Sequence, residues 1–246
     1  MQAPAWLTAQ PFAHRGLHDK ARGVPENSLA AFRAAVEAGY GIELDVRLSR
    51  DGVAMVFHDS TLDRMCGEPG RVDQLDAAEL QKKRLLGTAE TIPRLTEVCA
   101  LMAGRRPILV EVKNASARLG PIETATAIAM RDYNGPFAVM SFNPRTVEWF
   151  EEHAPQLVRG QVIDLKPRPG PLGKLRLLGT AWLLWRRHGK PHFLAYDINR
   201  LPAPLATRAR REGMPLLSWT VRTPDHLRRA RDLADNIIFE AAGRPA

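Results

Sequence analysis

Two carboxylates lie two residues apart in the segment GIELDVRL, residues 41–48. Glu43 and Asp45 alternate with apolar residues, as in a strand whose side chains point to opposite faces in turn. In a buried strand these two acids would repel each other and lose their hydration unless a cation lay between them. We therefore expect Glu43 and Asp45 to ligate a metal ion. The alternative is a solvated strand face with two ordinary acids.

The segment ILVEVK, residues 108–113, places another carboxylate inside an apolar run. Glu111 and Lys113 share one face of this predicted strand, where an isolated charge would be costly. An ion pair between these two residues is one interpretation, although it leaves Glu43 and Asp45 unexplained. In the second interpretation, Glu111 joins Glu43 and Asp45 to hold one divalent cation, and Lys113 is available to bind an anion. Oxygen ligands favour a hard cation, Mg²⁺ or Ca²⁺, over zinc.

Two histidines each end a short apolar run. His14 lies in PFAHRG and His58 in AMVFHD. A single histidine at a strand end is more often structural than functional. Two of them, together with Arg15 and the carboxylates, predict acid–base chemistry on a phosphate group.

The elements that must position these side chains alternate between apolar runs and helical stretches. Residues 28–39 predict a helix capped by Asn27 or Ser28 and ended by Gly39, and residues 223–234 predict a helix capped by Thr223. Strands are expected at residues 11–15, 41–48, 108–113, 137–142, 157–163, 193–198, 216–221 and 236–240. Eight such units in 246 residues predict an α/β fold, a TIM-type (β/α)8 barrel.

An Asp-Gly pair at residues 51–52 interrupts this pattern and predicts a hairpin. Residues 53–58 would then form a return strand attached to the second barrel strand. Residues 59–91 would form a small insertion, with a short capped helix at DAAEL, residues 76–80. The insertion shapes the rim of the site or is a surface excursion without a role. We expect residues 1–246 to form a single domain.

The formal net charge of +8 is concentrated in one segment. From Arg159 to Lys190 there are eight basic residues and one acid, Asp164. The chain shows no recognisable nucleic-acid-binding module, so we expect an anionic small-molecule substrate and no nucleic acid. Residues 172–190 have an apolar centre with two tryptophans and basic ends. They predict either a barrel helix with a core face or a peripheral contact with an anionic membrane.

Several classes of protein are disfavoured by the sequence. It contains no Walker A loop, GxSxG elbow, HExxH or dinucleotide fingerprint. It has no apolar stretch approaching the length of a membrane span and no secretion signal at its start. The cysteines Cys66 and Cys99 lack metal-site spacing and suggest idle thiols in a reducing compartment. We therefore expect a cytoplasmic protein. Residues 172–190 are the segment through which it would contact the inner face of the membrane.

A set of motifs occurs in the order seen in the glycerophosphodiester phosphodiesterase family. These are HRG, PENSLAAF, GIELDVRLSRDGVAMVFHDSTLDR, IPRLTEV, EVK, SF and WTV. The resemblance extends from Phe12 to about Glu240. It implies a TIM-type barrel of lipid metabolism that hydrolyses glycerophosphodiesters to glycerol 3-phosphate and an alcohol with the help of a divalent metal.

The resemblance also implies roles for particular residues. His14 and His58 resemble the acid–base histidines, Glu43, Asp45 and Glu111 the metal carboxylates, and Arg15 and Lys113 the phosphate-binding cations of the family. Glu26 in PEN resembles its supporting polar residue, and Trp219 would form an apolar wall of the substrate pocket. The chain departs from the family pattern at Arg222, where asparagine is common, and at Phe239 and Glu240, which replace a Thr-Asp pair. These departures bear on specificity for the alcohol or the glycerol.

Two alternative functions remain open from the sequence. A lysophospholipase D-type enzyme would act on lysophospholipids at a membrane surface. A barrel that binds phosphodiesters without turnover would lack a metal ligand or a histidine of the family's set, and this chain has them all.

Overall fold

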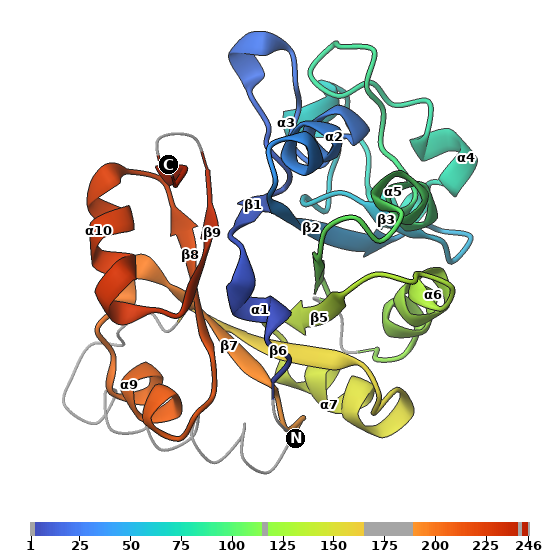
Figure 1. Cartoon of the computed structure of the whole chain (residues 1–246). Coiled ribbons are helices and arrows are strands. Elements are labelled where there is room, and N and C mark those ends of the chain that lie inside the picture. The colour runs from blue at the N-terminus through green and yellow to red at the C-terminus, as the bar shows by residue number, and fades with distance from the viewer. Residues whose placement is uncertain (1–2, 115–117, 165–188, 241–242, 246) are drawn as a thin grey trace, which may run out of the picture. The chain divides into compact units, whose positions relative to one another are not determined.

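The computed structural model describes residues 3–114, 118–164, 189–240 and 243–245 (Figure 1). Strands and helices alternate along the chain, and strands β1, β2 and β4–β9 coincide with the eight predicted apolar runs. This succession is the TIM-type (β/α)8 fold, as the sequence predicts. The chain divides into two compact units, which we call the first unit (residues 12–137) and the second unit (residues 1–11 and 138–246).

The first unit contains a parallel set of three strands. Its elements are β1 (Phe12–His14), η1 (Lys20–Arg22), α2 (Leu29–Glu37), β2 (Gly41–Leu48), β3 (Ala54–Val56), α3 (Asp63–Cys66), η2 (Val72–Gln74), α4 (Ala77–Leu80), α5 (Leu95–Met102), β4 (Ile108–Val112) and α6 (Pro121–Met130). Strand β2 pairs in parallel with β1 on one side and β4 on the other. The predicted hairpin is confirmed, since β3 returns antiparallel along β2.

Local capping explains where two of the predicted helices begin. The hydroxyl of Ser28 accepts a hydrogen bond from the backbone N–H of Ala31 at the start of α2, so Ser28 rather than Asn27 is the cap. In the second unit, Thr223 caps α10 (Pro224–Leu233) in the same way, accepting from the N–H of His226. Each cap satisfies a backbone donor that has no partner within its helix.

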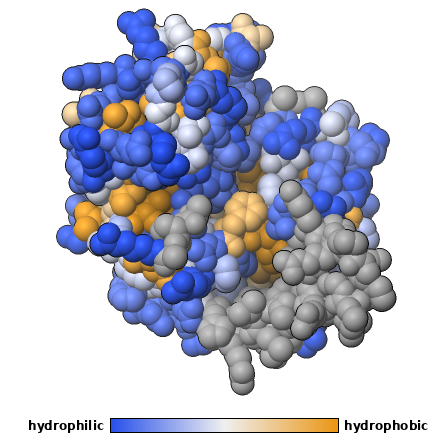
Figure 2. Space-filling view, turned by 180° about the vertical axis from the view of Figure 1, so that it is seen from behind, coloured by the Kyte–Doolittle hydropathy of each residue, from blue (hydrophilic) through white to orange (hydrophobic). Residues whose placement is uncertain are grey.

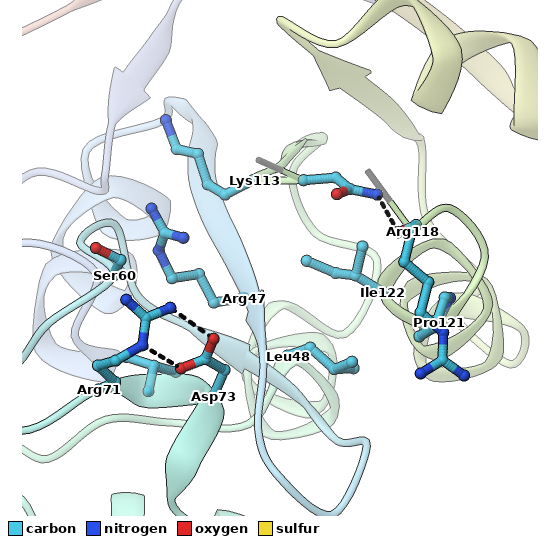
Figure 3. Close-up of a pocket in the computed structure, with 11 residues that line it drawn as sticks. Arg47, Leu48, Ser60, Arg71, Asp73, Lys113, Arg118, Pro121 and Ile122 are labelled. Atoms are coloured by element: carbon cyan, nitrogen blue, oxygen red, sulfur yellow. Dashed lines mark hydrogen bonds and ion pairs between the residues drawn. The ribbon is translucent and has the colours of Figure 1, made fainter. Parts of the chain in front are cut away.

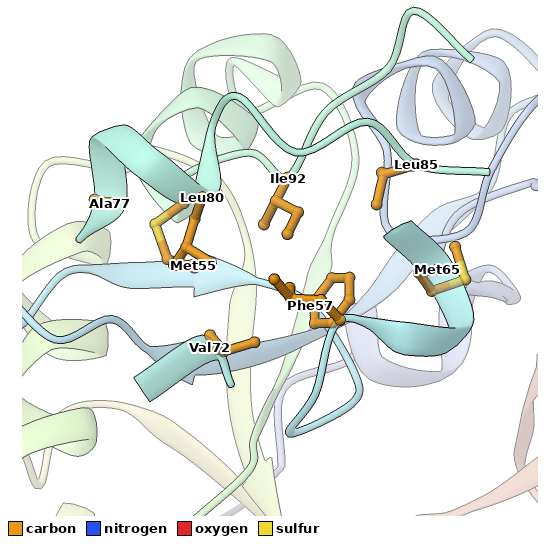
Figure 4. Packing of buried hydrophobic residues seen from close by; sticks show 9 residues of the cluster. Met55, Phe57, Met65, Val72, Ala77, Leu80, Leu85 and Ile92 are labelled. Carbon is orange, nitrogen blue, oxygen red and sulfur yellow. The ribbon is translucent and has the colours of Figure 1, made fainter. Parts of the chain in front are cut away.

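The segment 59–91 has an apolar cluster of its own (Figure 4). Met55 and Phe57, on and just after β3, meet buried side chains of α3, η2 and α4, including Met65, Val72 and Leu80. Because these short helices bury apolar side chains against the hairpin strand, the segment is packed structure rather than a loose loop. Its helix α4 occupies the predicted position, and the carboxylate of Glu79 accepts from the N–H of Asp76 at its start.

The second unit contains a parallel run of five strands. Its elements are α1 (Trp6–Ala9), β5 (Phe137–Ser141), α7 (Pro144–His153), β6 (Val158–Ile163), β7 (Phe193–Asp197), η3 (Ile198–Arg200), α9 (Pro204–Arg211), β8 (Leu216–Val221), α10, and β9 (Asn236–Phe239). The strands pair in chain order from β5 to β9. The amide of Asn236 donates to the carbonyls of Leu7 and Gln10, which fixes α1 to this unit.

Hydrophilic side chains dominate the described surface seen in Figure 2. The large exposed apolar residues of the described ranges are Ile128 and Phe142. Within those ranges, no helix has the length and apolar character needed to cross a membrane. The predicted interfacial segment 172–190 lies outside the described residues, except for Gly189 and Lys190.

Candidate active site

The strand register brings three carboxylates together in the first unit. Asp45 of β2 lies opposite Glu111 of β4, and Glu43 lies two residues earlier on the same face of β2. One carboxylate oxygen from each residue lies within 4.8 Å of the others. All three side chains are buried, with exposed fractions of 1% for Glu43, 0% for Asp45 and 6% for Glu111. This is the cluster that the sequence predicts.

The turn after β1 directs Arg15 toward this cluster. Its backbone has a φ of 55°, and its N–H donates to Oε2 of Glu43 at 3.1 Å. Its guanidinium Nε lies 3.2 Å from Oδ2 of Asp45, and another of its nitrogens lies 2.7 Å from Oε1 of Glu26. Gly16 follows with a φ of +78°, and a Cβ there would lie 2.8 Å from the backbone of Ala31. The turn therefore requires glycine at this position.

Asn27 belongs to the site, although the sequence suggested it only as an alternative helix cap. It has a φ of 55°, and its side-chain amide donates to Oδ2 of Asp45 at 2.9 Å. Its backbone N–H donates to the carbonyl of Arg15 at 2.9 Å, which joins the two ends of the connection between β1 and α2. A small polar residue tolerates this left-handed backbone better than most. The motif PEN thus supplies two site residues, Glu26 and Asn27.

Lys113 forms the ion pair of the first interpretation and also contacts Asp45 in the carboxylate cluster of the second. Its Nζ lies 2.5 Å from Oε1 of Glu111 and 2.9 Å from Oδ1 of Asp45. The ion pair with Glu111 is therefore present, and the three-carboxylate cluster is present as well. Lys113 and Arg15 place positive charge on two sides of Asp45.

The three buried carboxyl groups differ strongly in acidity. Burial, together with the charges of Asp45 and Glu111, raises the pKa of Glu43 well above its ordinary value. Burial also raises the pKa of Glu111 to about 7, with Lys113 opposing the rise and Asp45 adding to it. Burial would raise the pKa of Asp45 too, but the charges of Lys113 and Arg15 hold it below its ordinary value. Asp45 is therefore the carboxylate that stays ionised over the widest pH range.

The donor set fits a hard divalent cation. Three carboxylate groups supply only oxygen ligands, the preference of Mg²⁺ and Ca²⁺. Among the described residues, no hydrogen-bond partner meets the buried Oε1 of Glu43. Leaving a buried carboxylate oxygen unpaired is costly, and a cation bound by Glu43 would relieve that cost.

The two predicted histidines both belong to the first unit. Nε2 of His14 lies 3.8 Å from Oε2 of Glu43, and His14 is buried. Nδ1 of His58 lies 2.6 Å from Oδ1 of Asp59. The pKa of His58 is lowered, mainly by burial and also by the charges of Lys113 and Arg15, while Asp45 and Asp59 act in the opposite direction. Its ring is therefore neutral at physiological pH.

Arg64 connects two parts of the site that are far apart in the sequence. Its Nε lies 2.6 Å from Oδ2 of Asp59. Its two terminal nitrogens lie 2.9 and 2.7 Å from the two oxygens of Glu26. Since Asp59 also contacts His58 and Glu26 also contacts Arg15, a continuous polar chain runs from His58 to Arg15. Sequence reasoning missed this role of Arg64, although its motif STLDR was part of the resemblance.

The structure places Trp219 in the second unit, whereas the residues of the cluster belong to the first. It lies on β8, and its ring meets Phe142 edge to face at 5.3 Å. Two of the late departures from the family pattern pair with each other, because Nε of Arg222 lies 2.8 Å from Oε2 of Glu240. These two substitutions therefore compensate each other's charge.

Comparisons with known proteins agree with this fold and site. The profile of the glycerophosphoryl diester phosphodiesterase family matches residues 14–239. A glycerophosphodiester phosphodiesterase of Caldanaerobacter subterraneus subsp. tengcongensis is 31% identical over 246 residues, covering 93% of this chain and 92% of the relative. A protein of Mycobacterium tuberculosis named probable glycerophosphodiester phosphodiesterase 2 is also 31% identical, covering 94% of this chain and 86% of its own length.

Solved structures share the fold. A phosphodiesterase of Oleispira antarctica, determined with the product sn-glycerol-3-phosphate, superposes with a TM-score of 0.77 at 22% identity and covers 96% of this chain and 93% of its own. A protein of Agrobacterium tumefaciens described as a putative glycerophosphoryl diester phosphodiesterase superposes with a TM-score of 0.78 at 18% identity, covering 96% of this chain and 94% of its own.

The fold and the site together define a phosphoric diester hydrolase built on a TIM-type barrel. The chain belongs to the glycerophosphoryl diester phosphodiesterase family.

Proposed function

We propose that this protein hydrolyses glycerophosphodiesters to glycerol 3-phosphate and an alcohol, using one divalent cation held by Glu43, Asp45 and Glu111. The observation that carries the proposal is the buried carboxylate cluster, with an oxygen of Glu43 that lacks a hydrogen-bond partner among the described residues. The relatives' names and the product found in the Oleispira antarctica structure support the choice of substrate.

The cations of the site bind the phosphate of the substrate. Mg²⁺ or Ca²⁺, when bound, supplies positive charge that stabilises the negative charge developing on the phosphate oxygens. Arg15 and Lys113 add two fixed positive charges beside the carboxylates. Glu26 orients Arg15 by accepting from its guanidinium at 2.7 Å. Such preoriented charges stabilise the transition state more than the ground state.

The two histidines transfer protons. His58 is neutral at physiological pH because its pKa is lowered, so its ring can accept a proton from the nucleophile that attacks phosphorus. The nucleophile is water or the neighbouring hydroxyl of the substrate, and in the second case water then opens the resulting cyclic phosphate. Asp59 binds Nδ1 of His58 and thereby fixes the ring orientation, which leaves Nε2 for the proton transfer. His14, beside Glu43, then donates a proton to the leaving alcohol.

Product analysis tests this proposal. The wild-type protein is incubated with glycerophosphodiesters, or with lysophospholipids, in Mg²⁺, Ca²⁺ or chelator, and glycerol 3-phosphate and free alcohol are quantified. We expect glycerol 3-phosphate from the glycerophosphodiesters with metal and none with chelator. Conversion of lysophospholipids alone would instead identify a lysophospholipase D.

Two substitutions assign the activity to this site. We expect His14→Ala and Glu43→Ala each to abolish the release of glycerol 3-phosphate while the circular dichroism spectrum stays unchanged. His153→Ala is the matched control, because His153 is exposed in the second unit and stacks on Trp149. Full activity in either site variant would refute the assignment.

A further inference from the structure

A cavity of about 400 Å³ lies in the first unit (Figure 3). Lys113 lines the cavity and also pairs with Asp45 and Glu111 of the carboxylate cluster. The other charged residues of its lining are Arg47, Arg71, Asp73 and Arg118. Among the charged residues of this lining, four are cations and one is an acid, so the lining favours an anionic ligand over a cationic one.

Arg47 extends the row of functional side chains on β2. It lies two residues after Asp45 and four after Glu43, so all three share one face of the strand. Its Nε donates to the carbonyl of His58 at 2.6 Å, which holds the guanidinium at the edge of the site. In Figure 3 Arg47 extends toward Ser60 and Arg71, on the side of the cavity opposite Ile122 and Pro121.

Arg47 differs from the neighbouring Arg71 and Lys113, which both pair with carboxylates. Arg71 pairs with Asp73 through two contacts of 2.8 and 2.7 Å, and Lys113 pairs with two carboxylates. In the part of the chain that the structure describes, Arg47 forms no ion pair. Burial lowers the pKa of Arg47, against the nearby charges of Asp45 and Asp59, yet a guanidinium stays protonated in proteins. A partly buried guanidinium that contacts no carboxylate directly can form charge-assisted hydrogen bonds to a bound anion.

We propose that this cavity binds the leaving alcohol of the substrate and that Arg47 selects alcohols bearing an anionic group, such as a carboxylate. This inference rests on the proposed function and names its substrate class. Leu48, Pro121 and Ile122 provide apolar surface for the carbon skeleton of the alcohol. The planar guanidinium of Arg47 then meets the anionic end of the alcohol through charge-assisted hydrogen bonds.

A set of matched substrates tests this preference. Three glycerophosphodiesters share the glycerol phosphate and differ in the alcohol: 3-hydroxypropionate, the uncharged 1-propanol, and choline. We expect the wild-type kcat/KM for the carboxylate substrate to exceed that for the propyl substrate by on the order of tenfold. The choline substrate is expected to be the poorest, because its cation faces Arg47.

Substitutions assign the preference to Arg47. In Arg47→Met the ratio of kcat/KM between the carboxylate and propyl substrates should fall to near one, and Arg47→Lys should retain part of it. The ratio is used because loss of the contact with the His58 carbonyl can lower the rate with every substrate. Arg50→Met is the control: Arg50 is exposed and pairs with Asp76 and Glu79, so the ratio should equal that of the wild type.

Inhibition of the wild-type protein gives a second measurement that needs no variant. Free 3-hydroxypropionate should inhibit hydrolysis of the propyl substrate at concentrations where 1-propanol does not. A wild-type ratio near one, a ratio unchanged in Arg47→Met, or equal inhibition by the two alcohols would overturn the inference. Hydrolysis of none of the three substrates would instead overturn the proposed function.

Discussion

At the scale of single residues, the three carboxylates of the site differ in the groups that contact them. Arg15 and Lys113 compensate the charge of Asp45, and the neutral amide of Asn27 donates a hydrogen bond to it. Glu43 accepts the backbone N–H of Arg15 through Oε2, while its other oxygen lacks a hydrogen-bond partner in the described ranges. Asp45 is therefore the most acidic carboxyl group of the cluster, and the unpartnered oxygen of Glu43 is available to a cation.

Metal affinity should depend on pH in a defined direction. Metal ligation requires deprotonated carboxylates, and the pKa of Glu111 is raised to about 7. Below that pH the cation must displace a proton, so affinity should fall by up to about tenfold per pH unit for each proton released. Above it Glu111 no longer contributes to this dependence, and the dependence that remains comes from Glu43, whose pKa is also raised. Calorimetric titration with Mg²⁺ in two buffers of different ionisation enthalpy measures both the affinity and the proton release.

Glu111→Gln provides the comparison for this titration. The variant should bind Mg²⁺ more weakly and with a smaller pH dependence, because it has lost both a ligand and a titrating group. An affinity that stays constant between about pH 5.5 and 8 in the wild type would contradict the raised pKa values.

Residue types and strand faces were predictable from the sequence, whereas partners were not. Alternation along each strand is enough to place Glu43 with Asp45, and Glu111 with Lys113. The pairing of Lys113 with both Asp45 and Glu111 depends on the register between β2 and β4, which no local pattern specifies. The hydrogen bond from Asn27 to Asp45 was missed for another reason. Asn27 and Ser28 are both good helix caps, so the sequence offered Asn27 a local role.

At the scale of elements, short segments hold the proposed catalytic side chains in place. Helix α3 carries Arg64, which binds carboxylates from two different loops and so connects His58 with Arg15. Through Arg64, the segment 59–91 contacts Glu26 and Asp59 of the candidate site.

Removing Arg64 should affect turnover more than substrate binding. We expect Arg64→Ala to lower kcat by about tenfold or more with a smaller change in KM, because His58 and Arg15 lose their common support. Arg64→Lys should restore part of the rate through one of the two contacts. Lys83→Ala removes another ion pair of the same segment, that with Glu68, and should leave kcat unchanged. An equal decrease of kcat in the Arg64→Ala and Lys83→Ala variants would show that Arg64 has only a structural effect.

In the turn after β1, we expect one added methyl group at Gly16 to lower the free energy of unfolding. Gly16 and Gly52 both have positive φ, +78° and +82°. A Cβ at Gly16 would meet the backbone of Ala31 at 2.8 Å, whereas a Cβ at Gly52 meets nothing within 4 Å. Both Gly→Ala variants should lose about 1 kcal/mol of unfolding free energy from backbone strain, and Gly16→Ala should lose clearly more. Urea denaturation measures the difference, and equal losses would show that the contact with Ala31 does not matter.

The positions of the elements were largely predictable, because each strand is a short apolar run between helical stretches with recognisable caps. The Asp-Gly turn likewise predicted the β2–β3 hairpin. The apolar cluster under residues 59–91 was not predictable, since its members come from short helices without a long periodic pattern.

At the scale of the whole molecule, the proposed metal ligands and the tryptophans belong to different units. Glu43, Asp45 and Glu111 lie in the first unit, while all five tryptophans lie in residues 1–11 and 138–246. The sequence predicts a single domain for residues 1–246. An isolated parallel set of strands has unpaired edges, so we expect the two units to unfold together.

Tryptophan fluorescence can test this cooperativity. If the units unfold as one, Mg²⁺ bound in the first unit should raise the denaturation midpoint reported by tryptophans of the second. The Glu43→Gln variant should show a much smaller shift, which serves as the control. A midpoint unaffected by Mg²⁺ in a wild-type protein that binds the ion would mean that the units unfold independently.

The measurement that tests the proposed function most directly is a titration of activity with metal. Chelator-treated protein is supplied with increasing Mg²⁺, and release of glycerol 3-phosphate is followed in parallel with calorimetric binding of the ion. We expect no activity without metal and a rate that rises in proportion to the occupancy of one site, with both lost in Glu43→Gln. Undiminished release of glycerol 3-phosphate by the metal-free protein, or by Glu43→Gln, would contradict the proposed metal site.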